Sequence, residues 1–359
     1  MRARYLIPSI SLSFIACAPS AAPPAEAPPA AVAPAEPEAA PEPTAEELEA
    51  ERIAEEQAAK LEADRAQMQG QAQVELRRWT PELRAEASKL AETKYKDLKT
   101  GLTAALKGQH RVPGNADRDA ARHPVETLTF FGLTPKMSVL EYGPGGGWYT
   151  ELLAPVLAAE GKLFVTSADP NGPKENRQTL YAERLKLFLT KSPELYGKVG
   201  SVIFDADAPK LALSEPVDLA LVIRGFHGWV NSDSVGTWLD QIHGALKADG
   251  VLGIVQHRAA VGADPKAAAK LGYVPEAWLI EQVEAHGFKL AAKSEINANP
   301  KDTKDYERGV WALPPSLGLG ETDRQKYIDI GESDRMTLKF VKLAATADAQ
   351  PEAKKTDVK

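Results

Sequence analysis

Residues Val139–Tyr149, which read VLEYGPGGGWY, decide the fold of this 359-residue chain. A short apolar run leads into an acidic residue, a glycine-rich turn follows, and helix-forming residues begin directly after it. Glycine suits a place where the chain turns sharply, a ligand approaches the backbone and a helix packs tightly on a strand. The first turn of a helix also presents free N–H groups that bind a carboxylate. The stretch therefore predicts a strand, a ligand-binding loop and a helix.

Strand and helix patterns alternate along the chain around this loop. Such alternation is typical of an α/β protein. It predicts a doubly wound, mostly parallel, seven-stranded Rossmann-like sheet. We expect strands at 138–142, 162–167, 201–204, 217–223, 251–256, 288–295 and 335–341, and helices at 148–159, 175–189, 232–246 and 275–286.

The spacing of the glycines separates two classes of ligand. A dinucleotide loop has glycines at its first, third and sixth positions, but the sixth position counted from Gly143 is Trp148. The chain instead has Glu141 followed by Gly143, Gly145 and Gly147, an order that resembles the first motif of class I S-adenosyl-L-methionine (SAM) methyltransferases. That resemblance implies SAM as the cofactor, bound by these four residues, with Glu141 orienting its methionine part. A ligand-free turn and a nicotinamide oxidoreductase site remain as alternatives.

Two further carboxylates follow expected strands. Asp169 lies just beyond the second strand, where the same family places the group that binds the ribose hydroxyls. Dinucleotide folds use this place too, and a turn-capping role is the alternative. Asp205 directly follows the third strand, and the resemblance implies that it contacts the adenine. Asp207 is the second choice there, and a plain turn is the third.

The fourth strand is followed by Arg224–Trp229, which reads RGFHGW. Ligands of doubly wound sheets lie outside the carboxyl ends of the strands, so His227 is the candidate catalytic general base. A purely structural histidine is the alternative. Arg224 has two interpretations, which are binding of an acidic substrate and pairing with a nearby carboxylate.

A polar segment at 117–126 precedes the first strand. We interpret it as a lid over the cofactor, with Asp119 and Arg122 as lid or substrate residues. Trp148, at the start of the helix after the loop, is assigned to the same group. A solvated connection with locally paired charges is the alternative.

Longer blocks are similar to one predicted bacterial family of class I SAM-dependent methyltransferases. The similarity runs from Gly108 to Lys342, and that family has Trp where this chain has Gly143. It implies methyl transfer from SAM and does not imply the acceptor. The blocks are RHPVETL (122–128), FFGLTP (130–135), EYGPGGGWYT (141–150), RGFHGW (224–229), EINANPKD (295–302) and RGVWALPP (308–315).

The N-terminus resembles the signal of a bacterial lipoprotein. Arg2 and Arg4 precede an apolar stretch, and Phe14–Cys17 is similar to a lipobox. The resemblance implies a lipid anchor on Cys17, and therefore a cell-envelope protein attached to the outer membrane on its periplasmic or surface side. The alternative is an ordinary secretory signal that contains a chance cysteine.

Composition divides the chain into five parts. After the signal peptide at 1–17, we expect a disordered Ala/Pro/Glu-rich linker at 18–45 and a helical spacer at 46–107. The class I methyltransferase-like domain then spans 108–343, and a disordered tail spans 344–359.

The net charge and the spacing of the histidines argue against nucleic-acid binding and against a metal site. The net charge of −7 argues against a nucleic-acid partner, and the six histidines have no metal-ligand spacing, so we expect no metal. The sequence favours a SAM-dependent methyltransferase that transfers the methyl group directly from the sulfonium to a small molecule or an envelope component. The alternative is a catalytically inactive envelope lipoprotein of the same fold that binds a nucleoside-like ligand.

Overall fold

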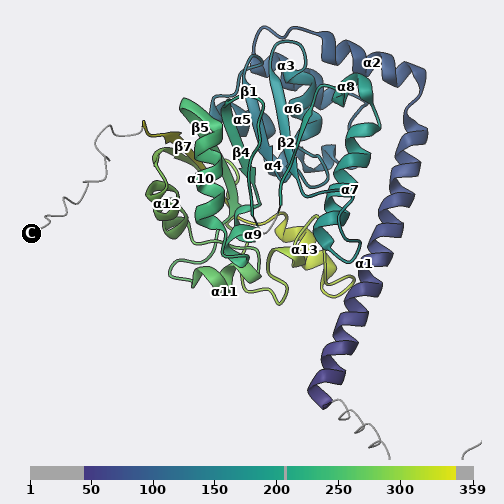
Figure 1. The fold of residues 1–359 in the computed structure, drawn as a ribbon, viewed down its shortest axis with the longest axis vertical. Helices are drawn as coiled ribbons and strands as arrows, with labels where there is room; N and C mark the ends of the chain where they lie inside the picture. Colours follow the sequence, from purple (N-terminus) through teal and green to yellow (C-terminus); the bar gives the residue numbers. More distant parts are fainter. Residues whose placement is uncertain (1–43, 206–207, 345–359) are drawn as a thin grey trace, which may run out of the picture. The chain divides into compact units, whose positions relative to one another are not determined.

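The computed structural model describes residues 44–205 and 208–344 (Figure 1). The chain divides into two units, Met1–Arg52 and Ile53–Lys359. The signal peptide, Cys17, nearly all of the linker and residues 345–359 lie outside the described part, as does Asp207. Helix α1 (Ala45–Arg78) starts at a capping box, in which the Thr44 N–H donates to Glu47 and the Glu47 N–H donates to the Thr44 hydroxyl.

Seven strands form one sheet in the order β3-β2-β1-β4-β5-β7-β6. The first five strands are parallel, and β7 is antiparallel to both of its neighbours. The predicted doubly wound, mostly parallel, seven-stranded sheet is therefore confirmed. The strands are β1 (Ser138–Tyr142), β2 (Lys162–Ser167), β3 (Gly200–Ile203), β4 (Val217–Ile223), β5 (Leu246–His257), β6 (Phe288–Ser294) and β7 (Arg335–Lys342).

Helices cover both faces of the sheet, because side chains alternate along each buried strand. Val139 belongs to one apolar cluster and its neighbour Leu140 to the other. Around the first cluster lie α2 (Pro81–Glu92), α3 (Leu98–Lys107), α5 (Pro124–Phe131), α6 (Thr150–Leu157), α7 (Arg177–Thr190) and α8 (Pro193–Tyr196). Around the second lie α9 (Phe226–Asn231), α10 (Val235–Ala245), α11 (Pro265–Lys270) and α12 (Glu276–Ala285).

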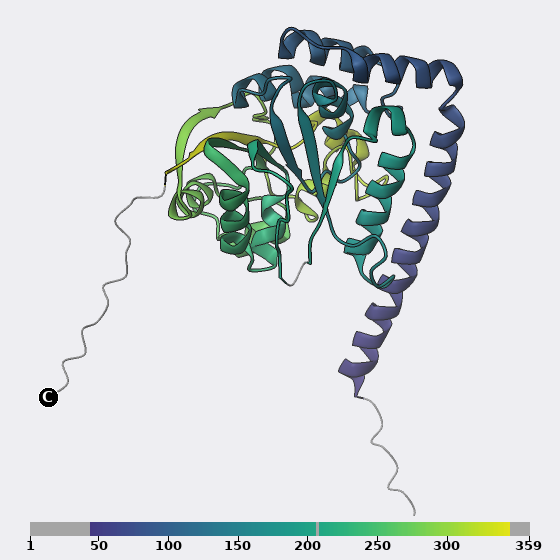
Figure 2. The ribbon, with the colours of Figure 1, turned by 45° about the horizontal axis from the view of Figure 1, so that its top comes forward.

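The helices before residue 108 take part in the core of the second unit. Leu83 on α2 and Leu102 on α3 are buried in the first apolar cluster. The α1 residues from Ile53 onward lie beside α7 (Figure 2), where Leu61 and Met68 pack on Leu180. The boundary expected at residue 108 therefore does not coincide with a change in packing.

Residues 297–334, whose shape the sequence leaves open, form an ordered excursion with its own small core. It contains a 3₁₀ turn, η2 (Gly309–Ala312), and α13 (Arg324–Ile330), and Tyr306 packs against Tyr327 inside it. The Arg258 N–H donates to the Asp334 carbonyl, which places the end of the excursion directly beyond β5.

Within residues 44–205 and 208–344, no helix is both long and apolar enough to cross a membrane.

Candidate active site

A cavity of about 290 Å³ lies at the carboxyl ends of β1, β4 and β5. Its walls come from the loop at 141–149, from Arg224 and His227 after β4, from His257 at the end of β5, and from the excursion through Trp311. This is the edge at which doubly wound sheets bind ligands. The fold therefore brings the predicted glycine loop and the predicted post-β4 residues together.

Two glycines of the loop form an open cradle. Gly143 and Gly145 have φ of 55° and 60°, a left-handed conformation that side chains disfavour. A Cβ atom built on Gly143, Gly145 or Gly146 meets no atom within 4 Å. A larger residue would therefore project into space that a ligand can use.

Gly147 has a different role from the other two glycines. Its φ is also left-handed, at 77°, but a Cβ atom there would lie 2.6 Å from Cζ of Phe188 on α7. Gly147 is also absent from the lining of the cavity. Close packing of the loop on α7, rather than ligand approach, requires this glycine.

Glu141 is buried at the end of β1 and lines the cavity. Its carboxylate accepts a hydrogen bond of 2.7 Å from the Thr150 hydroxyl at the start of α6. Burial raises the pKa of Glu141 to about 7, and the Thr150 bond only partly opposes this. Near neutral pH the group is therefore poised to ionise when a cation enters the cavity.

Arg122 ends the short helix α4 (Asp119–Arg122) and is 1% exposed. Its Nε lies 2.9 and 3.1 Å from the two carboxylate oxygens of Glu332 in the excursion. Its Nη1 is buried without a hydrogen-bond partner in the described structure. Burial, with the charge of Arg224 second, lowers the pKa of Arg122 to about 9.

Arg224 is the second guanidinium of the cavity, and it has φ of 57°. Its backbone N–H donates to the Val255 carbonyl at 2.7 Å, which fixes the turn after β4. In the described part of the chain its side chain forms no hydrogen bond and no ion pair within 4.0 Å. Burial lowers the pKa of Arg224, and Glu332 opposes that effect.

Two histidines, His227 and His257, line the cavity, and only His227 was predicted. The His227 and His257 ring centroids are 6.1 Å apart, and the Gln256 amide nitrogen lies 3.5 Å from Nδ1 of His227. Burial lowers the pKa of His227 to about 4; the Gln256 bond opposes this, and the Arg224 charge adds to it. His257 bonds to Ser333 and also has a pKa lowered by burial. Its place at the end of β5 is the signal that could have identified it.

Of the four lid or substrate residues, Arg122, Arg224 and Trp148 line the cavity and Asp119 does not. The guanidinium carbons of Arg111 and Arg122 lie 5.6 and 4.7 Å from the centroid of the Trp148 ring, within cation–π distance. Asp119 instead accepts hydrogen bonds of 2.5 and 2.8 Å from Arg111. The alternative of local charge pairing therefore describes Asp119.

Glu151 holds residues 111–115 in place, a role that no sequence pattern indicated. It is fully buried in α6 and accepts hydrogen bonds from Arg111 Nε at 3.0 Å, Asn115 Nδ2 at 2.8 Å and the Val112 N–H at 3.1 Å. Burial raises the pKa of Glu151 despite these partners. The segment before β1 is thus tied to the helix that follows the glycine loop.

Asp169 and Asp205 follow β2 and β3 along the same edge of the sheet, outside the cavity lining. The Asp169 Oδ1 accepts a 2.8 Å hydrogen bond from the Asn171 N–H, so this residue also caps a turn.

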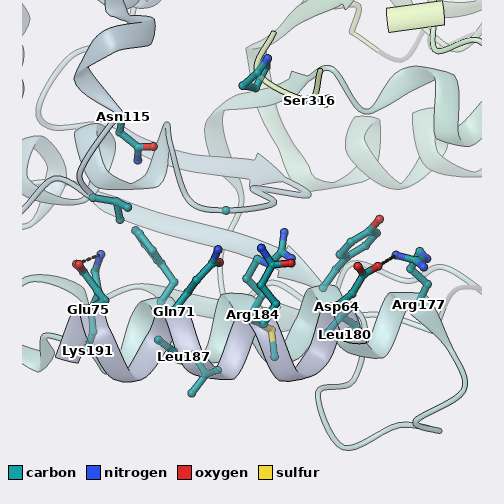
Figure 3. Close-up of a pocket in the computed structure, with 18 of the residues that line it drawn as sticks. Asp64, Gln71, Glu75, Asn115, Arg177, Leu180, Arg184, Leu187, Lys191 and Ser316 are labelled. Carbon is teal, nitrogen blue, oxygen red and sulfur yellow. Dashed lines mark hydrogen bonds and ion pairs between the residues drawn. The ribbon is translucent and has the colours of Figure 1, made fainter. Parts of the chain in front are cut away.

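A second cavity, of about 770 Å³, lies between α1 and α7 (Figure 3). Two ion pairs cross it, Glu75–Lys191 at 3.1 Å and Asp64–Arg177 at 2.9 Å. Arg118 lines both cavities, so the two are neighbours. No sequence pattern indicated this second cavity.

In the described ranges, no three acidic, histidine or cysteine side chains gather as a metal site would require.

Comparisons with known proteins rest on structure alone. No family model matches the sequence, and no curated protein sequence matches it significantly. Among solved structures, the chain is similar to a SAM dependent methyltransferase from Aquifex aeolicus, with 16% identity over 63% of this chain and 93% of that one and a TM-score of 0.40. It is also similar to the N-methyltransferase NodS from Bradyrhizobium japonicum, with 13% identity over 65% of this chain and 99% of that one and a TM-score of 0.40. A third similar structure is the glycopeptide N-methyltransferase MtfA complexed with S-adenosyl-L-homocysteine, with 12% identity over 62% of this chain and 90% of that one and a TM-score of 0.39.

Proposed function

We propose that the protein is a SAM-dependent methyltransferase that acts on a small-molecule acceptor. The observation that carries this proposal is the cradle beside a buried acid. Gly143 and Gly145 leave the backbone accessible, and Glu141 lies at the end of β1, on the edge of the sheet that binds ligands.

The residues present fit SAM. Glu141, with a pKa of about 7, is suited to the ammonium of the methionine part, and the loop backbone leaves room for close contact. Asp169 and Asp205, at the ends of β2 and β3, are assigned to the ribose and the adenine. Because β1, β2 and β3 are neighbours in the sheet, these assignments place the methionine part, the ribose and the adenine in that order along its edge.

Methyl transfer from SAM requires the protein mainly to align the acceptor with the methyl group. Bound SAM supplies an activated methyl group, and transfer is a one-step displacement by a nucleophile of the acceptor. We assign His227 to receive the acceptor's proton, since it lines the cavity beyond β4. Its pKa of about 4 makes the free imidazole a weak base, so this role requires the bound acceptor to raise that pKa.

Calorimetry on the full chain tests the cofactor. We expect SAM and S-adenosyl-L-homocysteine to bind, and Gly145→Val to weaken both at least 10-fold because its side chain would fill the cradle. Gly70→Ala is the matched control, since Gly70 lies on α1 with no atom within 4 Å of an added Cβ. Absence of heat at millimolar ligand would overturn the proposal. Binding of adenosine with no affinity for SAM would favour the inactive, nucleoside-binding alternative.

We also propose that the chain is a lipoprotein of the cell envelope, anchored through Cys17. The similarity of Phe14–Cys17 to a lipobox supports this. Mass spectrometry of the mature N-terminus in the native host is the test. A lipidated Cys17 is expected, and an intact, unmodified Met1 would overturn the assignment.

A further inference from the structure

We propose that the methyl acceptor is a small molecule with a carboxylate or phosphate group, which Arg122 and Arg224 bind in the cavity, and with a separate protonated nucleophile that receives the methyl group and passes its proton to His227. This inference rests on the proposed methyl transfer and names its substrate class.

The first support is the charge balance around the cavity. Glu332 pairs with Arg122 and also with Arg335, at 2.7 Å from its Nη1. Arg224 has no ion-pair partner within 4.0 Å among the described residues. Glu332 thus pairs with two of these three guanidinium groups and leaves Arg224 without a carboxylate, and Glu141 is only partly ionised near pH 7. Arg224 is half-buried, and a positive charge partly removed from water without a counter-charge is unfavourable.

The second support is an unsatisfied donor. Nη1 of Arg122 has no hydrogen-bond partner in the described structure, although the side chain is 1% exposed. Buried donors in proteins are nearly always paired. Since Arg122 lines the cavity, a ligand oxygen there would satisfy this group.

SAM alone does not balance these charges. The cofactor has a sulfonium, an ammonium and one carboxylate, so it carries one net positive charge, which ionisation of Glu141 offsets without neutralising the arginines. If the cofactor's carboxylate pairs with Arg122, Arg224 still has no ion-pair partner, and if it pairs with Arg224, Nη1 of Arg122 still lacks an acceptor. A neutral or cationic acceptor leaves the excess positive charge in place, whereas a carboxylate or phosphate neutralises it. The oxygens of either group can also accept two parallel hydrogen bonds from a planar guanidinium.

An anion at this place also has a consequence for catalysis. The charge of Arg224 lowers the pKa of His227. An acceptor that neutralises Arg224 raises that pKa and makes the imidazole a better base. Binding of the correct acceptor and activation of His227 are then coupled.

The test uses the full chain saturated with S-adenosyl-L-homocysteine. Thermal unfolding is followed while inorganic phosphate, acetate, acetamide or methylammonium is added at constant ionic strength with KCl. We expect saturable stabilisation by phosphate or acetate and none by the two other probes. The anion with the lower half-saturation concentration identifies the headgroup.

Variants separate the acceptor site from the cofactor site. Arg224→Gln is expected to raise the half-saturation concentration of the anion at least 10-fold while changing the affinity for S-adenosyl-L-homocysteine less than 3-fold, and Arg224→Lys should restore part of the anion effect. Arg324→Gln, an exposed position on α13, is the control. By NMR, the pKa of His227 should rise when the anion binds to the wild type and should not rise in Arg224→Gln.

Two results would overturn the inference. One is anion stabilisation that is absent or equal in Arg224→Gln and the wild type. The other is loss of cofactor affinity in Arg224→Gln with the anion effect intact, which would assign Arg224 to SAM. Failure of the cofactor to bind the wild type is a separate outcome that defeats the proposed function, since anion binding can still be measured without it.

Discussion

Arg122 and Glu332 are 210 positions apart in the sequence and form a buried ion pair, with Nε within 3.1 Å of both carboxylate oxygens. The pair joins helix α4 to the excursion that follows β6. Arg335 at the start of β7 binds the same carboxylate at 2.7 Å. One acid therefore connects three segments around the cavity.

Glu332→Gln is expected to destabilise the fold by about 3–5 kcal/mol, because it leaves two buried guanidinium groups without a counter-charge. Urea unfolding at pH 7 measures the change. Glu321→Gln is the control, since that side chain is 91% exposed, and should change stability little. Equal effects of the two variants would contradict the assigned role of Glu332.

Gly145→Ala and Gly147→Ala should differ although both glycines have positive φ. Gly145→Ala costs only the backbone strain, about 1–2 kcal/mol, because its Cβ meets open space. Gly147→Ala adds a collision with Phe188 at 2.6 Å and should cost at least twice as much. Thermal or urea unfolding distinguishes them. Phe188→Leu should relieve part of the Gly147→Ala cost in a double-mutant cycle, and strict additivity would contradict the collision.

Stability should fall as the pH rises through the titration of Glu141. Its pKa is raised from 4.5 to about 7 by burial, so the folded state holds the proton more tightly than the unfolded chain. The stabilisation is fully present below pH 4.5 and is lost as the pH rises through about 7, with a total of about 3 kcal/mol.

Glu141→Gln should remove this pH dependence, because the amide is neutral and its oxygen can still accept from Thr150. We expect the variant to be more stable than the wild type at pH 8 and similar at pH 5, as measured by unfolding at both values. A variant that is less stable at pH 8 would show that Glu141 is ionised at low cost.

Glu151→Ala should loosen the segment before β1. It removes the acceptor for Arg111, Val112 and Asn115 and leaves a buried guanidinium less well paired. Local opening should become easier by about 3 kcal/mol, seen as faster hydrogen exchange at 111–119 by mass spectrometry. Glu160→Ala is the control, since Glu160 is exposed. Unchanged hydrogen exchange at 111–119 in Glu151→Ala would contradict the role assigned to Glu151.

The central strands β1 and β4 were readily predicted because each is a short, mostly apolar run. β5 begins at Leu246, five residues before the expected start, because its first residues are polar. β1, β2 and β4 have the expected boundaries, and the glycine loop lies where the sequence placed it. The site was predicted only in part. Residues at the ends of strands could be located, but His257 was overlooked. Trp311 and Glu332 belong to residues 297–334, where the apolar residues follow no helix or strand period, so their positions could not be predicted.

The sequence by itself determined the doubly wound sheet, the glycine loop and the edge where a ligand binds, since these depend on local periodicity and on backbone conformations that only glycine adopts easily. The tertiary structure alone decided what surrounds that edge. It placed Gly147 against Phe188 rather than in the cavity, paired Asp119 with Arg111, and brought Glu332 to Arg122. Such pairings join residues distant in sequence, and burial, which sets the pKa of Glu141 and the charge balance of the arginines, exists only once the chain is packed.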